Sequence, residues 1–323
     1  MELRGRTVTV FGGAGFIGSV LVGLLARRGA RVRVPVRDMV KGAHLRPLGE
    51  PGQVSPLLCS TGNADSVARV IAGSDVVINL IGILFEGGGH GFESVHVDTA
   101  GRIAREAKKA DVPVFVHFSA LGADDRSASV YARTKSRGEA AVRTAFPSAT
   151  IVRPSVVFGP GDSFLENMAS LARTVPVIGY VDRGGEAGPT RIQPVYVGDV
   201  GRAVVRILET PALHGRTFEL GGDRVMTMKE IGQLVARSMN RSYPVVGISM
   251  GMARILATLV GWLPRPLLTR DVVRLLETDN VVQGKLPGLA ELGIEPQPIE
   301  MICATMMRGY RPLAPGIVLR RER

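Results

Sequence analysis

The sequence predicts an α/β protein built on a doubly wound parallel sheet, with a smaller and mostly helical part towards the C-terminus. Three observations support this class. Short runs rich in β-branched residues alternate with helical stretches through the first half of the chain. The runs are apolar throughout, which is typical of strands covered on both faces. A glycine-rich turn follows the first strand and opens directly into a helix.

The elements follow in order along the chain. Strands are expected at 7–11, 31–36, 54–59, 75–82, 112–119 and 150–159, and helices at 17–28, 94–110 and 130–146. After residue 159 we expect a loop at 181–195, a helix at 196–209 and a strand at 216–222. Thr227 and Glu230 have the spacing of a capping box, which predicts a helix running to about Met239.

From Tyr243 onward we expect helices interrupted by prolines and no strand. Residues 243–264 are long enough to span a bilayer, but an arginine such as Arg254 at mid-bilayer costs roughly 2.5–3.5 kcal/mol. We therefore expect 250–276 to face a membrane surface or a partner without spanning, the alternative being an ordinary helix pair packed on the smaller domain. The supporting residues are Arg254, Arg265, Arg270 and Arg274, with Trp262 before Pro264 as an interfacial anchor.

Composition excludes several classes of protein. The chain has 323 residues and a net charge of +11, with a sequence pI near 10.3. Aromatic residues make up only 5% and no basic stretch is interleaved with them, so no nucleic-acid partner is expected. Two cysteines and five scattered histidines predict neither a disulfide framework nor a metal site. An anionic membrane surface, an acidic protein partner and a merely solvated basic surface remain open, and no signal peptide is expected.

The motif with the clearest chemistry is VTVFGGAGFIGSVLVGLLARRG, which places Gly12, Gly15 and Gly18 between a strand and an amphipathic helix. This spacing lets the backbone turn tightly and approach a pyrophosphate, which then faces the helix N-terminus. The sequence therefore predicts dinucleotide binding by Gly12, Gly15, Phe16, Ile17 and Gly18.

The end of the second strand indicates which dinucleotide is bound. Folds that bind NAD usually carry an acid there for the ribose hydroxyls, but here Val36 holds that position and Arg37 follows. A guanidinium can hold a 2′-phosphate through two hydrogen bonds, and Lys41 and His44 add charge from the following turn. We therefore expect NADP(H), in practice NADPH, in preference to NAD(H).

Tyr131 and Lys135, in YARTK, share one face of a helix because they are four residues apart. A lysine ammonium nearby favours the phenolate and can also hold the nicotinamide ribose. Ser119 ends the fifth strand, from which its hydroxyl could bond a substrate oxygen. These three residues are the catalytic candidates.

Together, the glycine trio, Ser119, YARTK and IVRPSVVFGPGD resemble the extended short-chain dehydrogenase/reductase superfamily over roughly residues 5–235. The resemblance implies a Rossmann domain at 1–160, completed by about 190–225, and a smaller substrate domain at 161–189 and 226–323. It also implies that Asn79 and Gly82 lie near the cofactor ribose. Pro154, with Arg153 and Gly159, would lie near the nicotinamide.

A narrower resemblance covers almost the whole chain. VRDMVKGAHLRPLGEPGQV, VVINLIGILFE, RIQPVYVGDV and the late LLTRDVVRLLETDN are similar to the NADPH-binding accessory subunits of respiratory complex I and their bacterial relatives. The resemblance implies a structural cofactor, complex I core subunits as partners, and a place where the hydrophilic arm meets the membrane. The protein would then be peripheral, on the cytoplasmic face of a bacterial inner membrane or the matrix side of the mitochondrial one.

Three departures from active members of the superfamily bear on turnover. Ala120 follows Ser119 where a second hydroxyl residue is common, and Asp98 replaces the usual asparagine. Ser60, kept among the cofactor-binding residues, stands where an aspartate often contacts adenine. We therefore expect Ser119, Tyr131 and Lys135 to hold cofactor without sustaining a physiological reaction. The alternatives are an active NADP(H)-dependent oxidoreductase or epimerase, acting on an isoprenoid, sugar or quinone-like substrate, and a soluble NADPH sensor.

Overall fold

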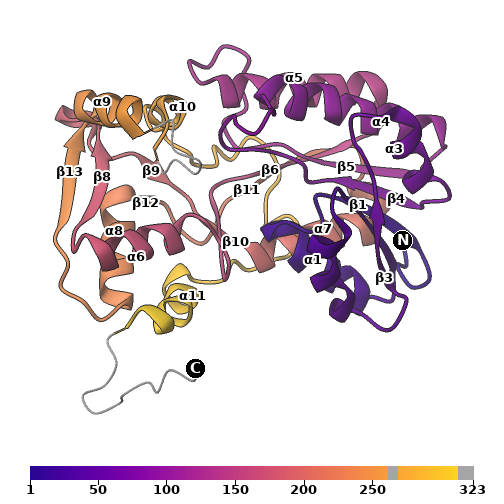
Figure 1. Ribbon diagram of the computed structural model, residues 1–323, viewed down its shortest axis with the longest axis horizontal. Helices are drawn as coiled ribbons and strands as arrows, with labels where there is room; N and C mark the ends of the chain where they lie inside the picture. Colours follow the sequence, from indigo (N-terminus) through magenta and orange to yellow (C-terminus); the bar gives the residue numbers. More distant parts are fainter. Residues whose placement is uncertain (261–267, 312–323) are drawn as a thin grey trace.

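The computed structural model describes residues 1–260 and 268–311, which form a seven-stranded parallel sheet and a smaller part beside it (Figure 1). The strand order is β11-β6-β5-β4-β1-β2-β3, and all neighbours in the sheet run parallel. The strands are β1 Thr7–Phe11, β2 Arg31–Val36, β3 Val54–Leu58, β4 Val76–Asn79, β5 Val114–Phe118, β6 Thr150–Pro154 and β11 Thr217–Leu220. The predicted doubly wound, Rossmann-type α/β fold is therefore confirmed.

Helices cover both faces of this sheet, as Figure 1 shows. On one face, β1 side chains Val8 and Val10 belong to a buried cluster with Leu21 and Leu25 of α1 (Phe16–Arg27). On the other face, Val77 and Phe115 pack with Ile103 of α4 (Ala100–Lys109). Successive side chains of a strand point to opposite faces of the sheet, and helices bury both faces. This explains why the strands are apolar throughout. The first face is covered by α1 and α7 (Val197–Glu209), and the other face by α3 (Ala64–Ile71), α4 and α5 (Val130–Ala145). The short α2 Met39–Gly42 follows β2.

The strand order reverses between β1 and β4, because the chain first builds β2 and β3 on one side of β1 and then continues on the other. In open α/β sheets, ligands bind outside the carboxyl ends of the strands at this reversal point. The turns after β1, β2, β4, β5 and β6 therefore border the expected ligand crevice.

The smaller part has its own buried clusters. Phe158, Ile178, Ile231 and Cys303 lie in the larger of the two. Its helices are α6 Leu165–Thr174, α8 Met228–Ser238, α9 Met250–Val260, α10 Arg270–Leu275 and α11 Ile299–Met306, and its strands are β7 Val157–Phe158, β8 Ile178–Asp182, β9 Arg191–Ile192, β10 Val195–Tyr196, β12 Met226–Thr227 and β13 Val245–Ser249. The predicted capping box at the start of α8 is present, with Thr227 and Glu230 bonded reciprocally. The division of the chain into domains at residue 160 stays a prediction.

Two local expectations were wrong. A strand, β13, forms after Tyr243 and pairs in parallel with β8 over five residues. Its sequence, VVGIS, includes a glycine, and Gly247 lets the ring of Tyr180 pack against the strand, because an added Cβ would lie 3.0 Å from that ring. The expected loop at 181–195 also contains the end of β8, the whole of β9 and the first residue of β10, and the last two strands pair with β12 and β7 respectively.

The pair α9 and α10 occupies the predicted membrane- or partner-facing region. Ala253 and Ala257 of α9 pack on Val273 of α10, whereas Met252 and Ile255 on the outer side are 49% and 57% exposed. No helix among the described residues is both long and apolar enough to cross a membrane. Trp262, Pro264 and Arg265 lie outside the described residues, so the interfacial role of 250–276 stays a prediction.

Candidate functional site

The glycine turn between β1 and α1 has no room for a side chain at Gly12 or at Gly18. Gly12 has φ +77°, and an added Cβ would lie 3.0 Å from the backbone of Leu80. A Cβ on Gly18 would lie 2.2 Å from the Gly12 carbonyl oxygen, so helix and turn are in direct backbone contact. These two glycines are therefore required by the turn itself.

Gly15 differs from both, because an added Cβ would have only the Gly12 oxygen nearby, at 3.3 Å. It is exposed, has φ −85°, and stands as the N-cap of α1 with no side-chain cap and no acidic residue in the first turn. The amides of Phe16 and Ile17 begin a helix whose positive end has no side-chain cap and lies just after the carboxyl end of β1. The turn thus forms a cradle for an anionic group, and only the absence of a side chain at Gly15 keeps it open.

Arg37 directly follows β2 and is exposed, and its role in holding a 2′-phosphate stays a prediction. One of its guanidinium nitrogens lies 2.8 Å from Nε2 of His90, a residue that the sequence analysis did not single out. The carboxylate of Asp38 caps α2, because it accepts hydrogen bonds from the amides of Val40 and Lys41. His44 contacts the Lys41 carbonyl oxygen through Nδ1, and the Lys41 side chain is exposed.

Asn79, Gly82 and Pro154 lie at or after the carboxyl ends of β4 and β6. Asn79 is fully buried, and its Oδ1 accepts from the amide of Ile81 while its Nδ2 lies 3.2 Å from Nδ1 of His117. It therefore shapes the turn after β4 from inside. Gly82 is exposed, and an added Cβ would lie 3.6 Å from Nζ of Lys135. Ser60 is exposed after β3, and its amide donates to Ser66 Oγ.

Ser119 and Lys135 meet at the end of β5. Nζ of Lys135 donates to the carbonyl oxygen of Phe118, at 2.9 Å, and Ser119 is the next residue. Ser119 is 5% exposed, and its Oγ has no hydrogen-bond partner among the described residues. Because buried polar groups are normally paired, this hydroxyl is free to bond a bound molecule.

Burial governs the titration of the catalytic candidates. It raises the pKa of Tyr131 to about 12, which is the opposite of the expected shift towards the phenolate. Burial also lowers the pKa of Lys135 to about 8, against the opposing attraction of Glu139. The nearby lysine therefore does not offset the loss of hydration at the tyrosine hydroxyl.

His96 was missed by the sequence analysis, because a lone histidine carries no local signal. Its Nε2 accepts from the amide of Ile83, so its Nδ1 carries the proton and donates to Oγ1 of Thr134. Thr134 in turn bonds the carbonyl oxygens of Val130 and Tyr131 in the first turn of α5. Burial, with the charge of Lys135 adding to it, lowers the pKa of His96 to about 3, so the ring is neutral at physiological pH.

A second missed residue, Asp271 of α10, lies at the start of α5. Its carboxylate accepts from Ser129 Oγ and the Val130 amide, each at 2.7 Å, and from the Tyr131 amide at 3.0 Å. No sequence signal could have paired residues that are 140 positions apart.

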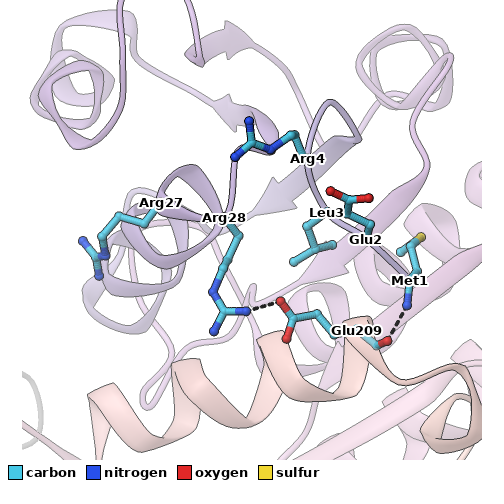
Figure 2. Close-up of a pocket in the computed structure, with 7 residues that line it drawn as sticks. All are labelled: Met1, Glu2, Leu3, Arg4, Arg27, Arg28 and Glu209. Atoms are coloured by element: carbon cyan, nitrogen blue, oxygen red, sulfur yellow. Dashed lines mark hydrogen bonds and ion pairs between the residues drawn. The ribbon is translucent and has the colours of Figure 1, made fainter.

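A separate pocket of about 510 Å³ is formed by Met1–Arg4, Arg27, Arg28 and Glu209 (Figure 2). It lies where α1 and α7 end, and Arg28 and the N-terminal amine both bond Glu209 there. This is the opposite end of the sheet from the crevice, so the pocket is not part of the candidate site. Among the described residues, no group of His, Cys, Asp and Glu side chains is arranged to hold a metal ion.

The assembled residues fit an extended dinucleotide. The cradle at Gly15 suits a pyrophosphate, and the exposed cations at Arg37 and Lys41 border one end of the crevice. Lys135 and the unpaired hydroxyl of Ser119 border the other end. When bound, such a nucleotide would supply hydride chemistry at the Ser119 end.

Comparison with known proteins supports the same assignment. A model of the NmrA-like family matches residues 4–252. Subunit 9 of the NADH dehydrogenase (ubiquinone) 1 alpha subcomplex, mitochondrial, from Mus musculus is 34% identical, covering 96% of this chain and 82% of the mouse protein. A ceramide reductase from Caulobacter vibrioides is also 34% identical, over 66% of this chain and 63% of that protein.

Among solved structures, triphenylmethane reductase from Citrobacter sp., complexed with NADP(H), superimposes with a TM-score of 0.68. It is 15% identical, and the match covers 93% of this chain and 99% of that one. These findings confirm the superfamily resemblance and the similarity to complex I subunits that the sequence predicts. The chain therefore belongs to the NmrA-like family of extended short-chain dehydrogenases/reductases.

Proposed function

We propose that the protein is a non-catalytic, NADPH-binding accessory subunit of respiratory complex I. The observation that carries this proposal is the open, uncapped turn at Gly15 in a chain that aligns over 96% of its length with a complex I subunit. The turn supports cofactor binding, and the near full-length alignment supports the partner.

In this proposal, the pyrophosphate lies on the amides of Phe16 and Ile17, and Arg37 recognises the 2′-phosphate. Lys135 holds the nicotinamide ribose, close to Gly82. An added Cβ on Gly82 would lie 3.6 Å from the Lys135 ammonium, so the absence of a side chain leaves this approach open to the ribose. Ser60 and Pro154 border the adenine and nicotinamide ends.

The absence of turnover is supported by the state of Tyr131. A general acid works best when its pKa lies near the working pH, and a tyrosine with a pKa of about 12 is a weak acid at neutral pH. Ser119 is followed by Ala120, so the neighbouring hydroxyl that could help fix a substrate oxygen is absent. Cofactor binding does not depend on either group, because the glycine turn and Arg37 contact the other half of the dinucleotide.

We place the protein at the junction of the hydrophilic and membrane arms, bound peripherally. It would lie on the matrix side of the mitochondrial inner membrane or on the cytoplasmic face of a bacterial one. The exposed Met252 and Ile255 on α9, with Arg270 and Arg274 exposed on α10, support contact with core subunits or an anionic lipid surface. Arg254 contributes less free charge, because it is paired with Glu277.

The experiment that tests this proposal begins with solubilised membranes from cells that express a tagged chain. The protein should co-purify with the core subunits and carry NADPH, and carbonate should release it from washed membranes. Tyr131→Phe should leave cofactor content and assembly unchanged, because it keeps the ring and removes only the hydroxyl. Loss of a cellular function in Tyr131→Phe, with cofactor and assembly intact, would overturn the non-catalytic assignment.

An active NADP(H)-dependent oxidoreductase or epimerase is the second candidate. It is favoured by the unpaired Ser119 hydroxyl and by the 34% identity to a bacterial ceramide reductase. Oxidation of NADPH by purified protein with ceramide-like ketones, aldehydes or quinones would support this candidate, provided that Tyr131→Phe abolishes the oxidation.

A further inference from the structure

The first turn of α5 is held by residues from three different parts of the chain. On its amide side, Asp271 binds Ser129, Val130 and Tyr131. On its carbonyl side, Thr134 bonds Val130 and Tyr131 and is itself bonded by His96. One turn further along α5, Lys135 bonds the end of β5. The position of Lys135 and Tyr131 at the crevice is therefore fixed at the start of their helix.

Of these contacts, the one made by Asp271 comes from the smaller part of the molecule. Ser129 already caps α5 by accepting from the Ala132 amide, at 3.3 Å. Asp271 adds a full negative charge at the helix N-terminus, where a carboxylate is favourable, and bonds amides that the Ser129 side chain does not reach. Ser129 is only 1% exposed, while Asp271 is half-buried, so the contact is partly shielded from water.

Asp271 is fixed in turn by its own short helix. Thr269 caps α10 by accepting from the Val272 amide, and Val273 is buried against Ala253 and Ala257 of α9. A displacement of α10 relative to α9 would therefore withdraw the carboxylate from α5. The same helix pair presents Met252 and Ile255 to the outside.

We propose that Asp271 is a positioning residue that makes the order of the α9–α10 pair and the binding of the nicotinamide half of the cofactor depend on each other. This inference rests on the proposed NADPH binding and adds a means of regulation to it. Such coupling is reciprocal, because two events linked through one contact must stabilise each other equally. A chain without cofactor would thus present a less ordered α9–α10 face to its partner.

The test compares two ligands that share one half. NADPH reaches from Arg37 to Lys135, whereas adenosine 2′,5′-bisphosphate carries only the adenosine half and the 2′-phosphate. In Asp271→Asn, we expect NADPH to bind about fivefold to tenfold more weakly and the bisphosphate to bind as in the parent. The variant removes the negative charge at the α5 N-terminus and one of the two accepting oxygens. General destabilisation of the fold would not separate the two ligands in this way.

Asp279→Asn is the matched control. Asp279 lies eight residues further along the chain and also accepts three hydrogen bonds, from the Arg191 amide and from the Arg183 and Arg191 guanidinium groups. None of its bonds reaches α5, so this variant should keep the parent's ratio of the two affinities. If Asp271→Asn does not fold, Ser129→Ala provides the same test, with an expected weakening of NADPH binding of about threefold.

Amide hydrogen exchange measures the same coupling in the opposite direction, from the bound cofactor to α10. NADPH should slow exchange of the α10 amides in the parent and in Asp279→Asn, but not in Asp271→Asn. Equal weakening of both ligands in Asp271→Asn, or an NADPH-induced slowing of α10 exchange in Asp271→Asn as large as in the parent, would overturn the inference while leaving the proposed function intact. Failure of the parent to bind NADPH would overturn both.

Discussion

Substitutions at Gly15 and at Gly18 should separate an effect on cofactor binding from an effect on folding. The two glycines belong to one motif, but their surroundings differ. At Gly18, a Cβ would lie 2.2 Å from the Gly12 oxygen and 2.5 Å from Gly13 Cα. Both contacts are with backbone, so the turn must move. Overpacking of this kind costs typically 1–3 kcal/mol. At Gly15, φ is −85° and the nearest atom would be 3.3 Å away, so alanine needs an adjustment of only a few tenths of an ångström.

The two variants should therefore fail in different assays. Without ligand, Gly15→Ala should melt within about 1 °C of the parent, because a small strain is offset by the ~0.4–1 kcal/mol gained from a less flexible unfolded chain. Gly18→Ala should melt about 2–6 °C lower, taking roughly 2 °C for each kcal/mol in a chain of this size. A methyl group on Gly15, however, projects into the cradle, where a phosphate would approach the helix amides.

Thermal melts with NADPH measure the second effect. At 100 times its dissociation constant, NADPH stabilises the parent by ~2.7 kcal/mol, or about 5 °C. If the methyl group weakens binding about 100-fold, the remaining stabilisation is ~0.4 kcal/mol, which shifts the melt by less than about 1 °C. A full 5 °C response in Gly15→Ala would refute the placement of the pyrophosphate on this turn. An unchanged melting temperature in Gly18→Ala would refute the steric account of the turn.

Three further predictions concern the rest of the site. NADPH should raise the melting temperature of the parent more than NADH does, because Arg37 can bond the 2′-phosphate, and Arg37→Glu should abolish this difference. Equal responses to the two ligands in the parent would contradict the role of Arg37. Ser119→Ala should raise the stability of the ligand-free protein to urea by ~1 kcal/mol, because a buried hydroxyl without a partner is costly; a loss of stability would mean that Ser119 Oγ is already satisfied. The free energy of unfolding should fall as the pH drops from 6.5 towards 3, because His96 has a pKa of about 3 when folded and 6.5 when unfolded, so that the unfolded chain binds more protons there. Urea melts of His96→Gln at pH 7, 6 and 5 should show a shallower decline than the parent, and His117, whose pKa burial also lowers, should account for part of what remains.

Local sequence patterns determined most of the large domain. Apolar runs and helical periodicity placed β1 to β5 and α1, α4 and α5 approximately, because each of these elements buries an apolar face whose spacing is visible in its own sequence. The strand expected at 150–159 is instead divided into β6, in the large sheet, and β7, which pairs with β10. The glycine spacing predicted a strand, a tight turn and a helix, since backbone contacts as close as that at Gly18 exclude every other residue. Thr227 and Glu230 identified the start of α8 for a similar reason, because both partners of the capping box lie within one turn.

Only the tertiary structure decided what surrounds the candidate site. The pairing of β13 with β8 and the contact of Asp271 with α5 join segments that are distant in sequence, and local periodicity carries no record of such contacts. The same is true of the pKa of Tyr131, which depends on how much water the fold removes from its hydroxyl. Spacing alone suggested that Lys135 would favour the phenolate, but burial raises the pKa of Tyr131 instead. A sequence thus specifies which groups are available, while desolvation and long-range hydrogen bonds, which exist only once the chain is folded, set their chemistry.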